Sequence, residues 1–439
     1  MQRSIHTPIR EAGRSLKSRN VGRTAIAIGA VAIAAAGVLT GCASNNSSAG
    51  TGQPITLTAN VWSDWKFVQS AGDEFKKTHP NVTLKLNAIT DGTYWTKIPG
   101  LFKTADTPDI SAVPIDADHY PSFVKDGLLA PLDSAWESSG LNKNVSASVK
   151  QQYTQNGHQY AVSVGGVAVP VIYYNKDLFK KAGIADPNQT VVTMDEFYAI
   201  SDKLKKAGID PLAAGMGDGS AAYRYFAPVF SSMCGAPWEK KIASGDTSGW
   251  KDACVEKALQ VVSDWKSKGI FAGGSSAGTA ASSVAEATFS AGKSGMEMEG
   301  TWAVGALRQG NPSMNIGWFQ MPIASGDSQK IVLSTVDSLA VSSGSKHVKE
   351  ATEFLAFMAN YAGIWQHGIP VRADLKAPTG TDPILTSLAK TLNSDGAAPY
   401  ALEQVTKADL ISTIDNAIVA VIAGQQSPSA AAGSIAAGA

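Results

Sequence analysis

Histidine and cysteine are scarce in this chain of 439 residues, and this limits the chemistry that it can support. The six histidines are scattered, and no two of them have the spacing of metal ligands. The sequence contains neither a Gly-Lys-Ser/Thr phosphate loop nor a Gly-x-Gly-x-x-Gly dinucleotide motif. It therefore predicts no metal centre and no bound cofactor.

An excess of charge of one sign is also absent, because 37 basic residues balance 37 acidic residues. Six of the basic residues but only one acidic residue lie in 1–41, so the remainder holds 31 basic and 36 acidic residues, a formal charge of −5. No cluster of lysine and arginine remains after residue 41. This distribution argues against nucleic acid as a partner.

A serine-hydrolase motif occurs literally at 274–278, where the sequence reads Gly-Ser-Ser-Ala-Gly. A nucleophile elbow needs a strand before this motif and a helix directly after it. Here the motif lies within 273–283, a stretch of glycine, serine and alanine. We interpret it as a loop.

The N-terminus has the order of an export signal. Six basic residues precede an apolar run at 25–39, which is too short and too poorly flanked for a stable transmembrane helix. The run ends in Leu-Thr-Gly-Cys42, which resembles a bacterial lipobox and implies that residues 1–41 are removed and Cys42 is lipidated. The alternative is an ordinary secretory signal. Residues 42–54 are rich in serine, glycine and asparagine, which predicts a flexible tether.

Export also bears on the other two cysteines, Cys234 and Cys254. An even pair in an oxidising compartment predicts a disulfide. Such a bond would close a loop of about 20 residues and stabilise the fold by roughly 3 kcal/mol. We expect the protein at the extracellular face of the cell membrane, and the alanine-rich signal is typical of a Gram-positive bacterium.

The organisation of the remaining chain indicates an α/β protein. About 400 residues exceed a typical single core, so two lobes are expected. Alternating apolar residues at 55–61 and 82–89 predict strands, and helical spacing at 65–78 predicts a helix between them. Thr193, followed by Glu196 at the capping-box position, predicts the start of another helix. Strands alternating with helices indicate a parallel sheet covered by helices.

Aromatic and acidic residues gather at the expected ends of these strands. Trp62 follows the first strand, Asp116 follows the third, and Trp302 lies between a strand and a helix. Ligands of open α/β sheets bind beyond the carboxyl ends of the strands. Indole rings pack on the C–H faces of a sugar, and each charged hydrogen bond to a hydroxyl contributes about 1.5–3 kcal/mol. This composition predicts a sugar cleft; the alternative is that the tryptophans are core residues and the acids cap helices.

Several segments, taken in order and spacing, carry a family resemblance. They are Phe75–Val82, Thr107–Ile110, Gly127–Leu132, Tyr173–Ile184 and Gly295–Trp302. The chain from about residue 55 to residue 424 thereby resembles the extracellular solute-binding proteins of sugar-importing ABC transporters, the family that includes maltose-binding protein.

This resemblance implies a two-lobe periplasmic-binding-protein-like fold of type II, with hinged lobes that each contain a mainly parallel sheet covered by helices. The implied lobes are 55–160 plus 330–365 for lobe 1 and 161–329 plus 366–439 for lobe 2. The segments that cross between them would lie near 160–164, 322–334 and 363–367.

The resemblance also implies ligand contacts. The expected ligand-binding residues are Trp62, Asp64, Asp116, Tyr223, Glu299, Trp302, Asp337 and Arg372. Trp302 and Tyr223 would stack on the sugar, and Asp116 would bind its hydroxyl groups. The chain departs from the family at Gly165-Gly166, where some members carry a carboxylate, and this leaves the identity of the sugar open.

The expected function is that of a monomeric, non-catalytic receptor, which captures a mono- or oligosaccharide and delivers it to the permease of an ABC importer. Two alternatives stay open. One is a secreted glycoside hydrolase with Glu297, Glu299 or Asp116 as acid or base. The other is the same fold with a polyamine, phosphate ester or peptide as its ligand.

Overall fold

The computed structural model describes residues 53–439 with gaps, and the strands and helices below are built from these residues. The gaps are 64, 90–93, 95–96, 99, 105–106, 117–118, 169, 188–191, 219–220, 323–334 and 396–405. The predicted signal, Cys42 and most of the predicted tether therefore lie outside the described residues, as does Asp64. Within the described part of the chain, no helix combines the length and apolar character that crossing a membrane requires.

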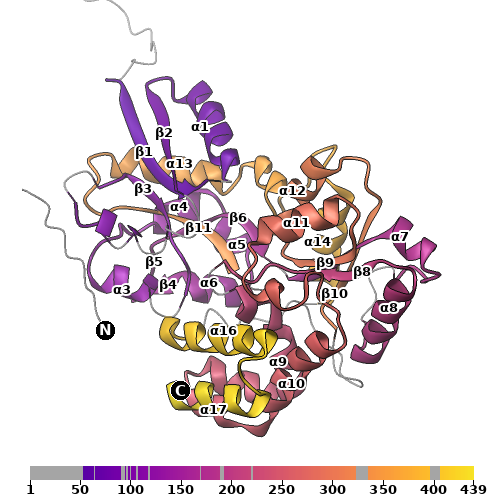
Figure 1. Ribbon diagram of the computed structural model, residues 1–439. Helices are drawn as coiled ribbons and strands as arrows, with labels where there is room; N and C mark the ends of the chain where they lie inside the picture. Colours follow the sequence, from indigo (N-terminus) through magenta and orange to yellow (C-terminus); the bar gives the residue numbers. More distant parts are fainter. Residues whose placement is uncertain are drawn as a thin grey trace, which may run out of the picture. The chain divides into compact units, whose positions relative to one another are not determined.

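The first sheet has six strands, in the spatial order β12-β6-β11-β3-β1-β2 (Figure 1). The strands are β1 (Ile55–Trp62), β2 (Val82–Ile89), β3 (Ile110–Ala112), β6 (Val162–Ala168), β11 (Thr335–Val341) and β12 (Ile369–Pro370). β1 is parallel to β2 and to β3, whereas β11 is antiparallel to β3 and β6, and β12 is antiparallel to β6. The strands predicted at 55–61 and 82–89 are confirmed.

The second sheet has four strands in the order β10-β7-β9-β8. They are β7 (Val171–Asn175), β8 (Asp210–Ala213), β9 (Ser294–Glu299) and β10 (Ile316–Gln320). β9 is parallel to β8, but β7 is antiparallel to both β9 and β10. A separate two-stranded sheet pairs β4 (Thr154–Gln155) with β5 (His158–Gln159).

Both large sheets are therefore mixed, and the expectation of mainly parallel sheets is wrong. Parallel neighbours need a crossover connection, usually a helix, within their own sheet. β6 and β7 are consecutive strands that belong to different sheets, and so are β10 and β11. β11, which enters the first sheet from the second, is free of this constraint and pairs antiparallel with β3 and β6.

Helices cover the first sheet and enclose one core. α1 (Lys66–Thr78) buries Phe67, Val68, Ala71 and Phe75 along one face, which confirms the helix predicted at 65–78. It packs against β2 and against α13 (Val348–Met358). The shorter helices are α3 (His119–Lys125), α4 (Asp133–Ser138), α5 (Leu141–Asn144) and α6 (Ala147–Tyr153), and a 3-10 turn, η3 (Ala362–Gln366), follows α13.

The second sheet has a separate core on each face. Met296 and Met298 of β9 face the larger core, which includes side chains of the C-terminal helices. Glu297 and Glu299 alternate with them and lie directly opposite Tyr173 and Val171 of β7, which belong to the other core. Directly opposite residues of an antiparallel pair share a face of the sheet. Two glutamates thus point into an apolar layer.

Helices surround the second sheet, and Figure 1 shows α16 and α17 next to α9 and α10. The helices are α7 (Lys176–Lys181), α8 (Met194–Lys206), α9 (Ala221–Ala243), α10 (Ala253–Ser267), α11 (Ser282–Ser290), α12 (Ala303–Gly310), α14 (Pro383–Asp395), α16 (Ala408–Ala423) and α17 (Pro428–Gly438). The capping box predicted at Thr193 and Glu196 is confirmed at the start of α8.

The predicted disulfide is confirmed. Cys234 in α9 and Cys254 in α10 are bonded, with their Cα atoms 5.2 Å apart. Gly235, directly after Cys234, has a φ of +76° and breaks the regular helical geometry of α9. The interpretation of 274–278 as a loop also agrees with the structure, because these residues form a 3-10 turn, η2, between Gly273 and Thr279.

The change from one sheet to the other differs in position from the predicted crossings. β6 stays paired with β11 up to Ala168, and β7 of the second sheet begins at Val171. The first change of sheet thus falls after the predicted 160–164, because β-pairing extends the strand. β12 likewise keeps residues 369–370 in the first sheet, beyond the predicted 363–367. The crossing predicted at 322–334 lies almost wholly outside the described residues.

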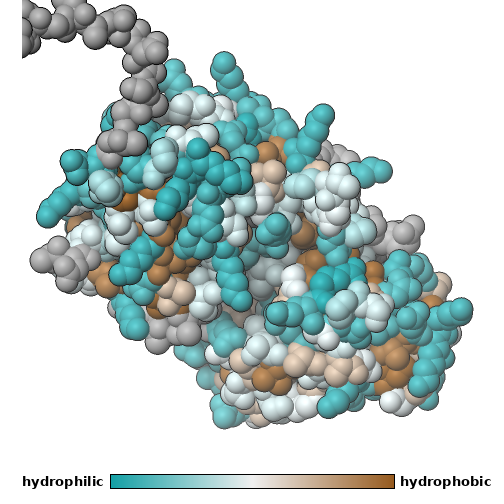
Figure 2. Space-filling model, turned by 90° about the horizontal axis from the view of Figure 1, so that it is seen from above, coloured by the Kyte–Doolittle hydropathy of each residue, from teal (hydrophilic) through white to brown (hydrophobic). Residues whose placement is uncertain are grey.

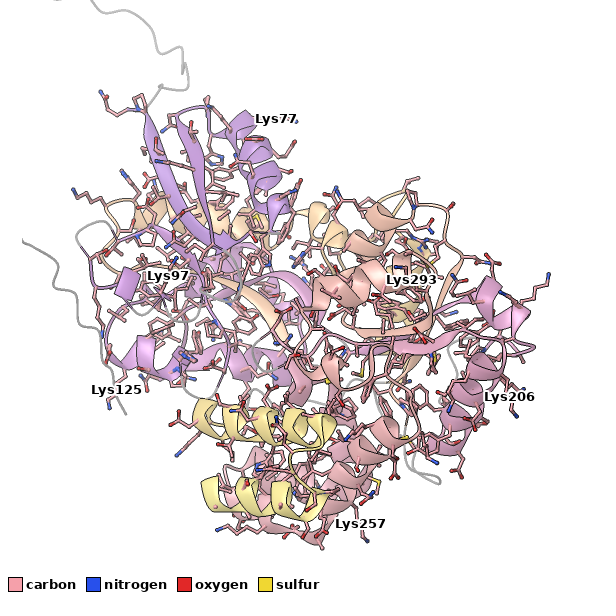
Figure 3. The ribbon with its side chains drawn as sticks, in the orientation of Figure 1. Lys77, Lys97, Lys125, Lys206, Lys257 and Lys293 are labelled. Carbon is pink, nitrogen blue, oxygen red and sulfur yellow. A yellow bond between two sulfur atoms is a disulfide. The ribbon has the colours of Figure 1, made fainter. Side chains whose placement is uncertain are left out.

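Several lysine side chains mark the surface of the protein. Figure 3 shows Lys77, Lys125, Lys206 and Lys257 at the periphery of the ribbon, and all four are exposed. Hydrophilic residues cover most of the face seen in Figure 2, and hydrophobic ones are visible in small patches. Of the described large hydrophobic side chains, that of Val284 in α11 is the one that is exposed, at 55 %.

Candidate functional site

The carboxyl ends of β1 and β3 lie at the same edge of the first sheet, because these strands are parallel neighbours. Trp62 ends β1, and the ring of Tyr94 stacks on its indole at a centroid distance of 4.4 Å. Tyr94 also donates its hydroxyl to the carbonyl of Ala112, the last residue of β3, at 2.7 Å. The ring of Trp65 is tilted against Trp62, at a centroid distance of 4.7 Å. We call Trp62, Trp65 and Tyr94 the aromatic platform.

Trp62 is the exposed member of this platform. Tyr94 is fully buried and Trp65 is 3 % exposed, whereas Trp62 is only partly buried. The two buried rings support the indole of Trp62 from within the core. A supported aromatic face at a strand end suits the apolar face of a ligand.

Asp116 follows β3 and caps α3. Its Oδ1 accepts hydrogen bonds from the backbone N–H groups of His119, at 2.6 Å, and Tyr120, at 3.4 Å. Its Oδ2 lies 2.6 Å from Nδ1 of His119. A carboxylate at this place satisfies the free N–H groups of a helix start. The helix-capping alternative therefore accounts for Asp116, whose oxygens have protein partners.

The second sheet places Trp302 just after the end of β9, at the start of α12. Its side chain is partly buried, so one part of the indole is accessible. The guanidinium carbon of Arg224, in α9, lies 5.5 Å from the ring centroid. This distance is within the range of a cation–π interaction. A partly buried indole with a cation over its ring is thus the aromatic feature at this strand end of the second sheet.

Glu299 ends β9 and is fully buried. Its Oε1 accepts hydrogen bonds from the hydroxyl of Tyr225 and from the backbone N–H of Gly300, the latter at 3.0 Å. Its Oε2 has no hydrogen-bond partner among the described residues. Burial raises the pKa of Glu299 to about 7, against the opposing effect of these two hydrogen bonds. With no exposed surface, Glu299 cannot contact a ligand directly, and the expectation of a ligand contact is corrected here.

Glu297 precedes it by two residues on the same face and is also fully buried. Neither carboxyl oxygen has a hydrogen-bond partner in the described part of the chain. Burial, followed by the charges of Glu299 and Glu286, raises the pKa of Glu297 well above its usual value. Burial thus favours the protonated form of Glu297, because an isolated buried carboxylate is strongly disfavoured.

Tyr223 is a core residue. It is fully buried, its backbone N–H donates to Oδ1 of Asp415 at 3.0 Å, and its hydroxyl lies 3.0 Å from Oγ1 of Thr406. Its ring also packs edge-on against Trp250. The expected stacking of Tyr223 on a ligand is wrong, because core packing covers the ring.

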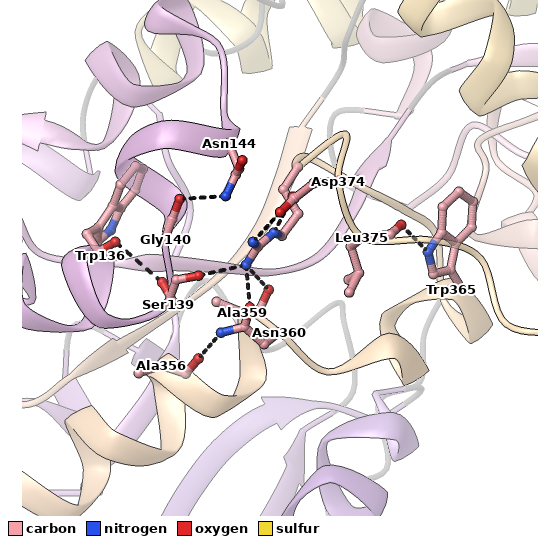
Figure 4. Close-up of polar contacts among 11 residues, drawn as sticks. Trp136, Ser139, Gly140, Asn144, Ala356, Ala359, Asn360, Trp365, Asp374 and Leu375 are labelled. Carbon is pink, nitrogen blue, oxygen red and sulfur yellow. Dashed lines mark hydrogen bonds and ion pairs between the residues drawn. The ribbon is translucent and has the colours of Figure 1, made fainter.

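Arg372 holds parts of the chain together, and its hydrogen-bond partners Ser139, Ala359, Asn360 and Asp374 are labelled in Figure 4. Its Nε and Nη2 donate to the two carboxylate oxygens of Asp374, each at 2.7 Å. Its Nη1 donates to the carbonyls of Ser139 and Ala359 and to Oδ1 of Asn360. Every nitrogen of a side chain that is 7 % exposed thus has a protein acceptor. This geometry assigns Arg372 a structural role and corrects the expected ligand contact.

The two other predicted ligand contacts are Asp64 and Asp337. Asp64 and the side chain of Asp337 lie outside the described residues. The backbone of Asp337 is in β11, at an irregularity of the pairing with β6 between Val336 and Ser338. Bulges of this kind are frequent beside functional sites, because they redirect side chains.

Three residues of the site were missed by the sequence analysis: Tyr94, Arg224 and Tyr225. Arg224 and Tyr225 are adjacent in the sequence to Tyr223, which was selected instead. A helix turns by about 100° per residue, so neighbours in sequence face different ways. The sequence pattern indicated the correct segment, but only the packing of α9 shows which of its side chains face Glu299 and Trp302.

No group of three or more histidine, cysteine, aspartate or glutamate side chains lies together as a possible metal site in the described ranges.

The fold, which has two mixed sheets covered by helices, belongs to the class of type II periplasmic-binding folds. A solved structure described as a chitin oligosaccharide binding protein matches with a TM-score of 0.75 at 21 % sequence identity. The match covers 88 % of this chain and 98 % of that chain. This likeness confirms the predicted fold class.

Residues 65–364 match the family of bacterial extracellular solute-binding proteins, and the chain belongs to this family. An uncharacterised ABC transporter extracellular-binding protein of Pyrococcus horikoshii is 27 % identical, over 73 % of this chain and 71 % of that protein. A multiple sugar-binding protein of Streptococcus mutans is 23 % identical, over 72 % of this chain and 75 % of that protein. The family expected from the sequence is confirmed.

Proposed function

We propose that the protein binds a mono- or oligosaccharide and delivers it to the permease of an ABC importer. One observation carries the proposal: a partly exposed indole follows a strand end in each large sheet, Trp62 in the first and Trp302 in the second. Two such rings suit the two faces of a sugar. The names of the Streptococcus mutans relative and of the chitin oligosaccharide binding protein support the same ligand class.

The proposed mechanism is closure of two lobes that follow the two sheets. In this proposal the lobes are joined where the chain changes sheet, as it does between Ala168 and Val171. Hinge closure around a ligand is a known binding transition. The ligand favours the closed form only by its greater affinity for that form.

We further propose that the ligand leaves unchanged, without turnover. A glycoside hydrolase needs two carboxyl groups that flank the scissile bond. Glu297 and Glu299 have no exposed surface, and both oxygens of Asp116 are engaged with α3 and His119. Recovery of intact sugar after incubation with a stoichiometric amount of protein is the expected result, and released product would contradict it.

The proposed location is the extracellular face of a Gram-positive cell membrane, where the monomeric protein is held by a lipid on Cys42. The support is the order of basic residues, apolar run and cysteine at the N-terminus. Stable anchoring needs more than one lipid chain, which a lipoprotein cysteine provides.

A thermal-shift panel tests the sugar proposal. The panel contains maltose, raffinose, stachyose, galactose, chitin oligosaccharides and xylo-oligosaccharides, with sn-glycerol 3-phosphate, spermidine and a tripeptide as other ligand classes. A ligand at 100 times its dissociation constant stabilises the folded state by about 2.7 kcal/mol, which is readily measured. We expect at least one sugar to stabilise the wild-type protein, and the variants W62A and W302A to lose this effect.

Tyr198 of α8 offers a matched control. Like Trp302 it is a partly buried aromatic ring under a cation, in this case Lys268 at 4.9 Å, but it lies on a covering helix and not at a strand end. Y198A should retain the sugar response. If only a compound of another ligand class stabilises the wild-type protein, that class is the ligand and the sugar proposal is wrong. Stabilisation by none of the compounds would also contradict the proposal.

A further inference from the structure

Gly300 lies between Glu299 and Trp302, and hydrogen bonds hold both its backbone N–H and its carbonyl. Its backbone N–H donates to Oε1 of Glu299 at 3.0 Å. Its carbonyl accepts hydrogen bonds from the hydroxyl of Tyr173 at 2.9 Å and from the backbone N–H of Ala303 at 3.1 Å. Tyr225 in turn donates its hydroxyl to the same Glu299 oxygen. We call Tyr173, Tyr225 and Glu299 the Gly300 clamp.

The indole of Trp302 lies against Gly300. A methyl group added at Gly300 would overlap the six-membered part of the indole, at Cζ3, Cη2 and Cε3. The backbone of Gly300 is outside the left-handed region, so alanine could adopt its conformation. Glycine is therefore required here for the position of the indole and not for the turn itself.

The clamp residues themselves cannot reach a ligand. Tyr173, Tyr225 and Glu299 are fully buried, whereas Trp302 is partly exposed. α9 connects the buried clamp to the partly exposed Trp302. Its Tyr225 donates a hydrogen bond to Glu299, and the neighbouring Arg224 lies over the Trp302 ring. The buried hydrogen bonds and the exposed ring thus form one connected unit.

We infer that Tyr173, Tyr225 and Glu299 are positioning residues, which fix Gly300 so that the indole of Trp302 is held ready for its ligand. The inference rests on the proposed function, because it takes Trp302 as a ligand contact. It gives Glu299 an indirect role in place of the direct contact expected from the sequence. A ring held in place before binding loses less conformational freedom when the ligand arrives, and this favours affinity.

The central test compares G300A with G305A. Both substitutions replace a glycine by alanine within four residues of Trp302, but a methyl group at Gly305 would have no atom nearer than 3.9 Å. The indole position is measured without any ligand, as acrylamide quenching of the fluorescence that Trp302 contributes, defined by subtracting the W302F variant. We expect G300A to change this quenching and G305A to leave it unchanged.

The second measurement is affinity for the panel sugar that stabilises the wild-type protein most. We expect G300A to bind about tenfold more weakly, and Y225F and Y173F to bind a few-fold more weakly, because each removes one hydroxyl of the clamp while retaining the ring. G305A should bind like the wild type. The melting temperature of each variant is measured in parallel, so that weaker binding is compared at retained folding.

The outcomes separate the clamp from the sugar proposal. Altered quenching together with weaker binding by G300A and Y225F supports the inference. Unaltered quenching overturns it, and so does altered quenching with wild-type affinity, although sugar binding itself would then stand. If the wild-type protein binds none of the panel sugars, the proposed function fails, and the quenching of Y225F decides alone whether the clamp holds the indole.

Discussion

At the scale of single residues, the same residue type has different roles according to its surroundings. Glu297 and Glu299 are two residues apart on β9, and both are fully buried. Glu299 bonds to Tyr225 and Gly300, whereas Glu297 has no hydrogen-bond partner among the described residues. Neither glutamate is an accessible site acid, although the sequence pattern placed both beside Trp302.

The raised pKa of Glu299 predicts a stability that falls with rising pH. The folded state holds this proton more tightly than the unfolded state, so the contribution to stability is fully present below the unfolded pKa of about 4.5 and is lost as the pH rises through about 7. E299Q, which resembles the protonated acid, lacks this loss. From pH 4.5 to pH 8 we expect the wild-type protein to lose roughly 3 kcal/mol more unfolding free energy than E299Q.

Urea unfolding at a series of pH values measures this difference. E137Q, which alters an exposed glutamate of α4, is the matched control and should follow the wild-type pH dependence. Equal pH dependence of E299Q and the wild-type protein would contradict the assignment of a buried, protonated carboxyl.

At the scale of elements, hydrogen bonds and a disulfide hold helices to neighbouring segments of the chain. Arg372 connects its own segment to the end of α13 and to the turn after α4 through three hydrogen bonds, and two more hold it to Asp374 within that segment. The disulfide between Cys234 and Cys254 joins α9 to α10 beside the break at Gly235. Such links fix elements whose packing alone leaves some freedom.

Removal of the disulfide should destabilise the protein. For a loop with a sequence separation of 20 residues, the chain-entropy model gives about 3 kcal/mol for the double variant C234A/C254A. Guanidinium unfolding of the wild-type protein with and without dithiothreitol should show a similar loss, and the double variant should be insensitive to the reductant. Sensitivity of the double variant would mean that the reductant acts elsewhere.

At the scale of the whole molecule, the likeness to known structures covers most of the described residues. The match to the chitin oligosaccharide binding protein extends over 88 % of this chain, although the sequences are only 21 % identical. Sheets and their covering helices are thus retained, while the side chains that meet a ligand are free to differ. For this reason the ligand has to be determined on this chain itself.

The proposed membrane attachment is also tested at the scale of the whole molecule. In cells, C42A should release the protein from the membrane fraction into the medium, because the proposed lipid acceptor is lost. Immunoblots of membrane and medium fractions measure the distribution, and E137Q is the control, since it alters an exposed residue that is outside the signal. Retention of C42A in the membrane would contradict lipidation at this residue.

The sequence by itself determined the local elements, the disulfide partners and the family. Alternation in β1 and β2, the apolar face of α1 and the capping box of α8 are local patterns, so neighbouring residues suffice to predict them. The cysteine pair followed from its even number and the expected compartment. Trp62 and Trp302 were placed near strand ends for the same reason, because Trp62 is the last residue of β1 and Trp302 is three residues beyond the end of β9.

Only the tertiary structure decided which of the selected side chains remain accessible. Each buried residue among them is held by a hydrogen bond to a residue far away in the sequence. Tyr223 bonds to Asp415, 192 residues away, and Glu299 bonds to Tyr225, 74 residues away. Arg372 bonds to Ser139, 233 residues away. The tertiary structure also decided that both large sheets are mixed, because consecutive strands enter different sheets. Burial and strand direction both depend on contacts between distant parts of the chain, and a local pattern of residues does not contain those contacts.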